Sequence, residues 1–166
     1  MRLIRTLAAL LLVPVLLPAA AWSQATPEAA TGTAAPQTDM HPVSGLPVIP
    51  LTVASGGRTH TFRVEVAKSG SEQKKGLMFR TAMGADEGMI FPVSRPRRVA
   101  FWMKNTVIPL DIVFIGPDRR ILNIAANAVP YDKTPLRSAG AVGAVLELNG
   151  GRAGELGIGS GDTVTW

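Results

Sequence analysis

The chain has 166 residues, a formal net charge of +5 and no cysteine. Hydrophobic residues make up 46% of the sequence and charged residues 17%, a balance that is typical of a globular protein and excludes a largely disordered one. The absence of cysteine excludes disulfides, thiolate metal sites and thiol catalysis.

The first 25 residues predict a secretory signal peptide. Arg2 and Arg5 precede an apolar run over 7–21, and small residues ending at Ala25 follow it. The run is shorter than the roughly 20 residues that a membrane-spanning helix needs, and two prolines interrupt it. We expect cleavage after Ala25, no membrane span in the mature chain, and a periplasmic or secreted location. An uncleaved anchor is the alternative.

Residues 26–47 predict a flexible linker. This stretch is rich in Ala, Thr, Pro and Gly and has no apolar periodicity, so it cannot bury enough surface to offset its ordering entropy. Residues 48–166 are then expected to form a single β-rich domain, which is large enough for one core. Because no disulfide is available, packing alone must stabilise this domain.

Most of the domain predicts short strands. Residues 61–67 alternate apolar and polar side chains, which is the pattern of a half-buried strand. Stretches rich in Val, Ile and Phe predict further strands over 88–91, 99–103, 110–115, 121–126, 143–148 and 163–166. A Gly-Pro-Asp-Arg turn at 116–119 predicts that two of these strands form a hairpin.

Two short helices are expected. Ser69 and Glu72 have the spacing of a capping box and open a helix through about residue 77. A second helix is expected over 151–156, with Asn149 as its cap and Gly157 at its end. Many short strands with two small helices predict a mainly β (α+β) fold, either an antiparallel β-sandwich or a partly closed barrel.

Several blocks of this domain resemble a known family. They are Gly-Leu-Met at 76–78, Gly-Met at 88–89, Phe-Trp-Met-Lys-Asn-Thr at 101–106, Pro-Leu-Asp at 109–111, Leu-Glu-Leu at 146–148 and Gly-Asp at 161–162. Their order and spacing are similar to those of exported members of the domain of unknown function 192 family. The resemblance covers about residues 62–164 and implies a compact, sandwich-like β fold without an established activity. Gly143 and Ala144 depart from the bulkier residues that it implies at those positions.

The stretch 101–114 carries the residues on which a function would depend. Both faces of the expected strand 110–115 are apolar except for Asp111, so this carboxylate is expected to be at least partly buried. A buried carboxylate needs partners, and the nearest in sequence are Lys104, Asn105 and Thr106. Arg80 is a more distant candidate. Asp111 then either fixes the shape of this loop through hydrogen bonds or belongs to a ligand site.

Glu147 repeats this pattern between two leucines. An ion pair with Arg63, Lys104 or Arg80 is the structural explanation for it. If Glu147 instead shared a cleft with Asp111, the two would form a carboxylate pair of the kind used in acid–base catalysis and glycosidic bond cleavage.

Other chemistries have little support in the sequence. His41 lies in the expected linker, so a zinc site or a Ser-His-Asp triad would depend on His60 alone. No phosphate-binding or dinucleotide motif is present. The methionines at 78, 83, 89 and 103 are more typical of core packing than of a copper site. We therefore expect no metal and no cofactor.

The arginines at 95, 97 and 98 form the densest basic cluster. They lie beside proline with no aromatic residue between them, and exported proteins rarely meet nucleic acid, so no nucleic-acid partner is expected. We interpret this cluster as a solvated loop, with contact to acidic lipid or polysaccharide as the alternative.

Two functions remain open. The first is a non-catalytic binding module that uses the 102–111 loop to bind a small polar ligand, a glycan or an envelope protein. Its expected ligand-binding residues are Trp102, Lys104, Asn105, Thr106, Asp111 and Glu147. The second is a hydrolase or lyase with Asp111 and Glu147 as a carboxylate pair. We favour the binding module and expect a monomer.

Overall fold

The computed structural model describes residues 39–166, which belong to one folded unit. The expected signal peptide and residues 26–38 of the expected linker lie outside the described residues. The strands are β1 (Asp39–Met40), β2 (Pro47–Ser55), β3 (Arg58–Val66), β4 (Glu87–Arg97), β5 (Ala100–Phe101), β6 (Leu110–Ile115), β7 (Ile121–Ala128), β8 (Leu136–Arg137), β9 (Val142–Asn149) and β10 (Thr163–Thr165). The helices are α1 (Gly70–Lys75) and α2 (Arg152–Leu156).

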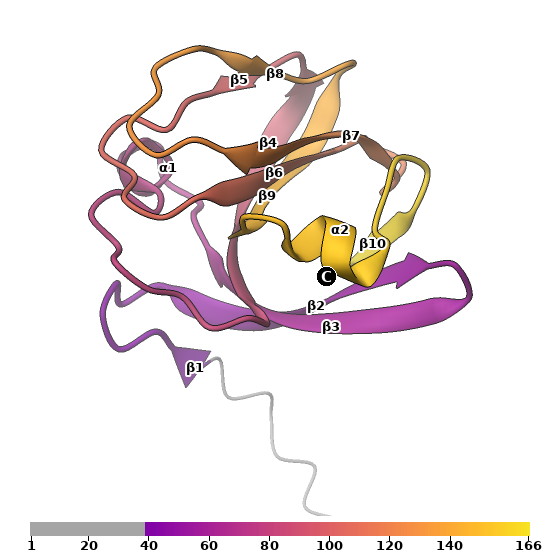
Figure 1. Ribbon diagram of the computed structural model, residues 1–166, viewed down its shortest axis with the longest axis horizontal. Helices are drawn as coiled ribbons and strands as arrows, with labels where there is room; N and C mark the ends of the chain where they lie inside the picture. Colours follow the sequence, from indigo (N-terminus) through magenta and orange to yellow (C-terminus); the bar gives the residue numbers. More distant parts are fainter. Residues whose placement is uncertain (1–38) are drawn as a thin grey trace, which may run out of the picture. The chain divides into compact units, whose positions relative to one another are not determined.

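Eight strands form one mixed sheet in the order β1-β2-β3-β4-β9-β6-β7, with β10 added to β2 (Figure 1). Neighbouring strands are antiparallel except β3 and β4, which run parallel. Strands β5 and β8 form a separate two-stranded ribbon. The sheet is sandwich-like and does not close into a barrel, which confirms the mainly β fold with two short helices.

Residues 39–47 belong to this fold, although the sequence places them in the linker. Strand β1 pairs with the start of β2, opposite Pro47 and Val48. Strand β2 itself was not predicted, because prolines at 47 and 50 interrupt its apolar pattern. Pro50 lies between the parts of β2 that pair with β1 and with β10, and a proline is tolerated at such a gap in a ladder.

The two helices begin differently. At α1 the predicted capping box is confirmed: the Ser69 hydroxyl accepts the Glu72 N–H at 3.2 Å, and the Glu72 carboxylate accepts the Ser69 N–H at 2.8 Å. At α2 the N-cap residue is Gly151, which has no side chain for this purpose. The expected cap Asn149 instead donates its amide to the carbonyl of Met83 at 3.1 Å, so that prediction was wrong.

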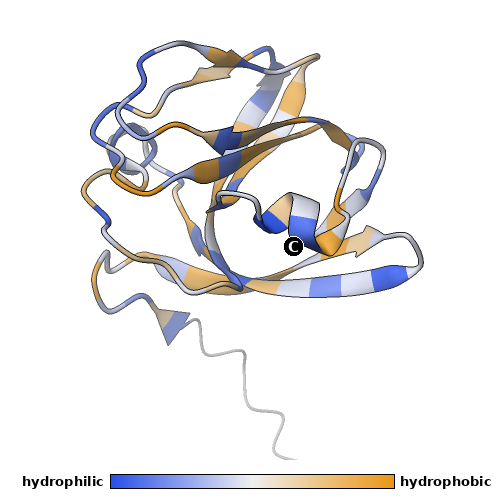
Figure 2. Ribbon diagram, viewed as in Figure 1, coloured by the Kyte–Doolittle hydropathy of each residue, from blue (hydrophilic) through white to orange (hydrophobic). Residues whose placement is uncertain are grey.

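The central strands β6 and β9 are buried on both faces, and one apolar cluster covers each face. Figure 2 shows these apolar strands inside the molecule and the polar tip of the β2–β3 hairpin outside it. Burying one large apolar side chain contributes about 2 kcal/mol, so these clusters are the main source of stability. No helix in residues 39–166 is long and apolar enough to span a membrane.

Helix α2 lies between the β2–β3 hairpin and the strands β6 and β9 (Figure 1). Its Ala153 belongs to the same apolar cluster as Leu51, Val64 and Leu146. The small residue Gly143 in β9 is explained by a close approach: a Cβ there would lie 3.1 Å from the Cα of Pro117. A bulkier residue at this position would push the β6–β7 turn away from β9.

Candidate functional site

Asp111, the second residue of β6, is fully buried, as predicted. Its Oδ1 accepts the backbone N–H groups of Asn127 and Gly151, each at 2.8 Å. Its Oδ2 accepts the N–H of Ala153, also at 2.8 Å. Because Gly151 and Ala153 open α2, this carboxylate supplies the oxygen that the N-cap side chain of a helix normally provides. It also ties the end of β7 to the turn that follows β9.

The expected partners of Asp111 were therefore wrong. Strand alternation points its side chain to the face that α2 covers, away from residues 104–106. Lys104 is exposed, and the buried Thr106 donates its N–H to the Met103 carbonyl at 3.0 Å. Asn105 places its amide 3.8 Å from the Met78 sulfur, and its carbonyl accepts the N–H of residue 79 at 2.9 Å.

Glu147 lies on the opposite face of the sheet from Asp111. In the β6–β9 register Asp111 faces Leu148, whereas Glu147 faces Ile112, and neighbouring residues of a strand point to opposite faces. The two carboxylates therefore do not share a cleft. The carboxylate pair proposed for a hydrolase or lyase was wrong for this geometric reason.

The ion pair expected for Glu147 is also not formed. Arg63 pairs with Asp39, and Arg80 pairs with Glu65. Oε2 of Glu147 is buried without a hydrogen-bond partner. Burial raises the pKa of this carboxyl to about 8, so it is mostly protonated at neutral pH.

A third buried carboxylate, Glu65, organises a polar cluster that the sequence did not predict. Arg80 binds it in a bidentate manner, with Nη1 2.5 Å from Oε1 and Nη2 3.0 Å from Oε2. The Ser44 hydroxyl donates to Oε2, and Nε2 of His41 lies 3.6 Å from Oε1. Residues 41–46, which we call the strap, are thereby fixed to β3. The sequence signal was Glu65 itself, a carboxylate between two valines, but two of its partners, His41 and Ser44, lay in the expected linker.

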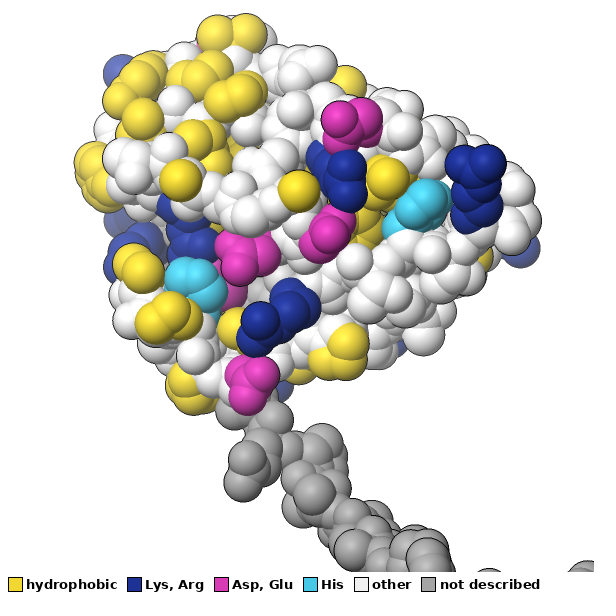
Figure 3. All heavy atoms as spheres, turned by 60° about the horizontal axis from the view of Figure 1, so that its bottom comes forward, with side chains coloured by type: hydrophobic (Ala, Val, Ile, Leu, Met, Phe, Trp, Pro, Cys, Tyr) yellow, Lys and Arg dark blue, Asp and Glu magenta, His cyan; other side chains and the backbone are white. Residues whose placement is uncertain are grey.

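Beside this cluster the surface is hollowed, with a volume of about 830 Å³. The hollow lies between the strap and the segment from α1 to β4, which we call the 75–87 segment. Figure 3 shows this side of the molecule, where a histidine lies among hydrophobic, acidic and basic side chains. The volume is that of a typical small-molecule site. The residues that line it include His41, Ser44, Lys75, Met78, Phe79 and Arg80.

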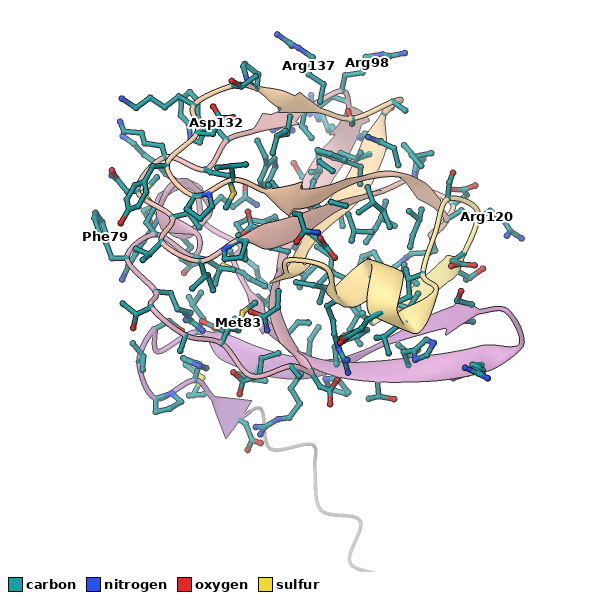
Figure 4. All side chains as sticks on the ribbon, in the orientation of Figure 1. Phe79, Met83, Arg98, Arg120, Asp132 and Arg137 are labelled. Atoms are coloured by element: carbon teal, nitrogen blue, oxygen red, sulfur yellow. The ribbon has the colours of Figure 1, made fainter. Side chains whose placement is uncertain are left out.

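Phe79 is the most unusual residue of the hollow. Its ring is 69% exposed and points away from the body of the molecule (Figure 4). Its backbone has φ of 63°, a left-handed conformation that costs a bulky residue about 1–3 kcal/mol. The carbonyl of Asn105, itself at φ 58°, holds this conformation by accepting the Phe79 N–H. Exposure and backbone strain both lower stability, and together they indicate a functional position.

The described residues contain no group of three or more His, Asp or Glu side chains that could hold a metal ion. Ser44 donates its hydroxyl to Glu65, while Nδ1 of His41 accepts the N–H groups of Val43 and Ser44 at 3.3 Å. Ser44 therefore donates to the carboxylate that is paired with Arg80 and not to the His41 imidazole, so these residues do not form a serine–histidine pair.

The profile of the DUF192 family, described as "Uncharacterized ACR", matches residues 51–166. This chain belongs to the DUF192 family. None of the curated proteins matches the sequence. The DUF192 domain is similar to the crystal structure of a protein of unknown function from Novosphingobium aromaticivorans, at 59% identity, with a TM-score of 0.76 over 77% of this chain and 91% of that one.

A second DUF192 relative of known structure comes from Sinorhizobium meliloti. It is 40% identical, with a TM-score of 0.71 over 72% of this chain and 94% of that one, and is described as a candidate transcription regulator. Neither description gives a ligand or a reaction. A function for this DUF192 domain must therefore be argued from the geometry of its own residues.

Proposed function

We propose that the domain is a non-catalytic binding module whose ligand occupies the hollow between the strap and the 75–87 segment. The observation that carries this proposal is Phe79, an exposed ring in a strained backbone at the edge of the hollow. A ligand that stacks on this ring would recover part of the free energy that its exposure costs.

The lining favours a small polar ligand with one apolar face. Phe79 and Met78 offer apolar and polarisable surface, whereas Ser44 and Arg80 offer hydrogen-bonding groups already held in place by Glu65. Lys75 lines the same hollow and takes part in none of the ion pairs found in residues 39–166. A sugar ring, which has an apolar face and a polar rim, fits this description.

The 102–111 loop supports the proposed site. Its Asn105 carbonyl fixes the Phe79 backbone, and its amide lies against Met78. Trp102 and Lys104 are exposed but do not line the hollow. Asp111 and Glu147 are buried, so we assign them to the framework of the domain.

Ligand-observed NMR on the full chain with a set of monosaccharides, oligosaccharides and small carboxylates tests the proposal. We expect at least one sugar to bind, and Phe79→Ala to weaken that binding about tenfold or more, because the stacking surface is lost. Tyr131→Ala is the matched control, since Tyr131 is also exposed, aromatic and at φ 63° but does not line the hollow.

Equal loss of binding in both variants would place the site elsewhere. The absence of binding by every compound would contradict the sugar-type ligand. If Trp102→Ala abolished binding while Phe79→Ala did not, the ligand would lie on the 102–111 loop itself.

A further inference from the structure

We propose that a basic and aromatic surface of this domain docks on an anionic lipid bilayer. This surface, which we call the ribbon surface, consists of the exposed side chains of residues 95–106 and 129–142. None of these residues lines the hollow, so the inference goes beyond the proposed ligand site.

The two segments of the ribbon surface run side by side. Strands β5 and β8 pair at residues 100–101 and 136–137, and the Val99 carbonyl accepts the N–H of Ser138 at 3.1 Å. Toward the loops, Met103 donates its N–H to the Asp132 carbonyl at 2.8 Å. Toward the sheet, residue 97 of β4 lies opposite residue 142 of β9. The two backbone segments therefore form one continuous ribbon at the edge of the molecule (Figure 1).

The ribbon surface carries six basic side chains and a single acidic one, whereas the rest of residues 39–166 carries nine basic and ten acidic ones. The whole positive excess of the described part of the chain is therefore concentrated here. All six basic residues are exposed, and none belongs to an ion pair found within residues 39–166. In Figure 4 the side chains of Arg98 and Arg137 extend outward from the same end of the molecule. The basic residues are Arg95, Arg97, Arg98, Lys104, Lys133 and Arg137.

The same two segments also carry exposed apolar side chains. Trp102 is 56% exposed, Val129 64% and Tyr131 59%. Basic groups alone would suit any polyanion, but glycans and nucleic acids offer no hydrocarbon layer for an aliphatic side chain such as Val129. The head-group region of a bilayer accepts Trp and Tyr rings and apolar side chains, while anionic lipids attract Lys and Arg. An anionic bilayer therefore matches both components of the surface.

Co-sedimentation of the full chain with vesicles tests this inference. One set of vesicles contains phosphatidylcholine alone, and the other also contains a minority of phosphatidylglycerol. We expect tighter binding to the anionic set and weaker binding as salt is raised. The double variant R98Q/R137Q should weaken the anionic binding about thirtyfold, because each basic side chain near an anionic surface contributes about a fivefold factor.

The matched control is R58Q/K68Q, which removes the same charge from two exposed residues outside the ribbon surface. Its binding should stay within about twofold of the parent, since these side chains lie away from the lipid. Equal weakening by both double variants would overturn the inference, because only net charge would then matter. Equal binding of the parent to neutral and anionic vesicles would overturn it as well.

The fluorescence of Trp102 reports whether the ribbon surface faces the bilayer, once Trp22 and Trp166 are replaced by Phe. We expect its emission to shift to shorter wavelength on anionic vesicles and to be quenched by lipids spin-labelled in the head group. No quenching would overturn docking through this surface.

Binding to a sulfated polysaccharide or a DNA duplex without binding to anionic vesicles would identify a different polyanion and also overturn the inference. The residues substituted in these vesicle experiments do not line the hollow, so failure of vesicle binding and failure of sugar binding can be told apart.

Discussion

Asp111 on the α2 side of the central sheet and Phe79 at the loop end show how differently costly features are handled in this domain. On the α2 side, both oxygens of the buried Asp111 accept backbone N–H groups, and glycine takes the left-handed positions 151 and 157 at the two ends of α2. At the loop end, left-handed positions are occupied by Phe79 and Tyr131, whose side chains are exposed. On the sheet face opposite α2, one oxygen of the buried Glu147 has no hydrogen-bond partner. The Asp111 hydrogen bonds stabilise the fold, whereas the strained and exposed Phe79 lowers its stability.

The largest expected effect is on the α2 side. Asp111→Ala leaves three backbone N–H groups without their acceptor, of which that of Ala153 is buried and the other two are part-buried, and we expect the free energy of unfolding to fall by about 4 kcal/mol. Urea denaturation followed by circular dichroism measures this change. The α2 side would not be a stability element if the variant unfolded at the same urea concentration as the parent.

Asp111→Asn is the control for size. The amide keeps one acceptor oxygen but turns an NH₂ group toward a backbone N–H, so it should recover little of the lost stability. A fully stable Asn variant would show that shape, and not the acceptor oxygens, matters at this position.

How far the sequence predicts this arrangement depends on how local each interaction is. The capping box of α1 and the strand 110–115 were predicted, because a spacing of three residues or a run of six residues rich in Val, Ile and Phe determines them. The burial of Asp111 followed because both faces of that run are otherwise apolar. Its partners did not, since they lie 16, 40 and 42 positions away and are brought near only by the pairing of β6 with β7 and β9.

The candidate site was less predictable than the fold. The cluster around Glu65 joins residues up to 39 positions apart, and part of it lies in a strap that has the composition of a linker, so composition alone gave no reason to place the strap on the sheet. Phe79 was missed for another reason: its significance lies in a positive φ and in exposure, and neither leaves a mark in a single sequence.

An intermediate effect is expected at Glu147, and it depends on pH. The pKa of this carboxyl is about 8 in the folded domain against 4.5 ordinarily, so between these values the unfolded chain releases the proton first. Below pH 4.5 the carboxyl is protonated in both the folded and the unfolded chain, so the wild type has its full stability there. As the pH rises from 4.5 toward 8, only the unfolded chain loses the proton, and the free energy of unfolding falls. Glu147→Gln should match the wild type near pH 4 and be more stable by about 3 kcal/mol near pH 7.

Denaturant titrations across this pH range measure the difference between the two proteins. Glu65→Gln is the control, because Glu65 is also buried but has Arg80 as a charged partner, so its replacement should destabilise the domain at neutral pH. A difference between Glu147→Gln and the wild type that stayed constant with pH would mean that Glu147 is not held as a neutral acid.

The smallest expected effect is a gain in stability at Phe79. Glycine adopts a φ of 63° without steric cost, so Phe79→Gly removes the strain while losing only an exposed ring, and we expect about 1 kcal/mol of added stability. Phe79→Ala keeps most of the strain and should leave the melting temperature almost unchanged. Thermal unfolding separates the two variants, and both should bind the ligand of the hollow poorly. If Phe79→Gly were instead less stable than the parent, the Phe79 ring would stabilise the folded domain. The loop end would then contribute to stability, as the hydrogen bonds of Asp111 do on the α2 side.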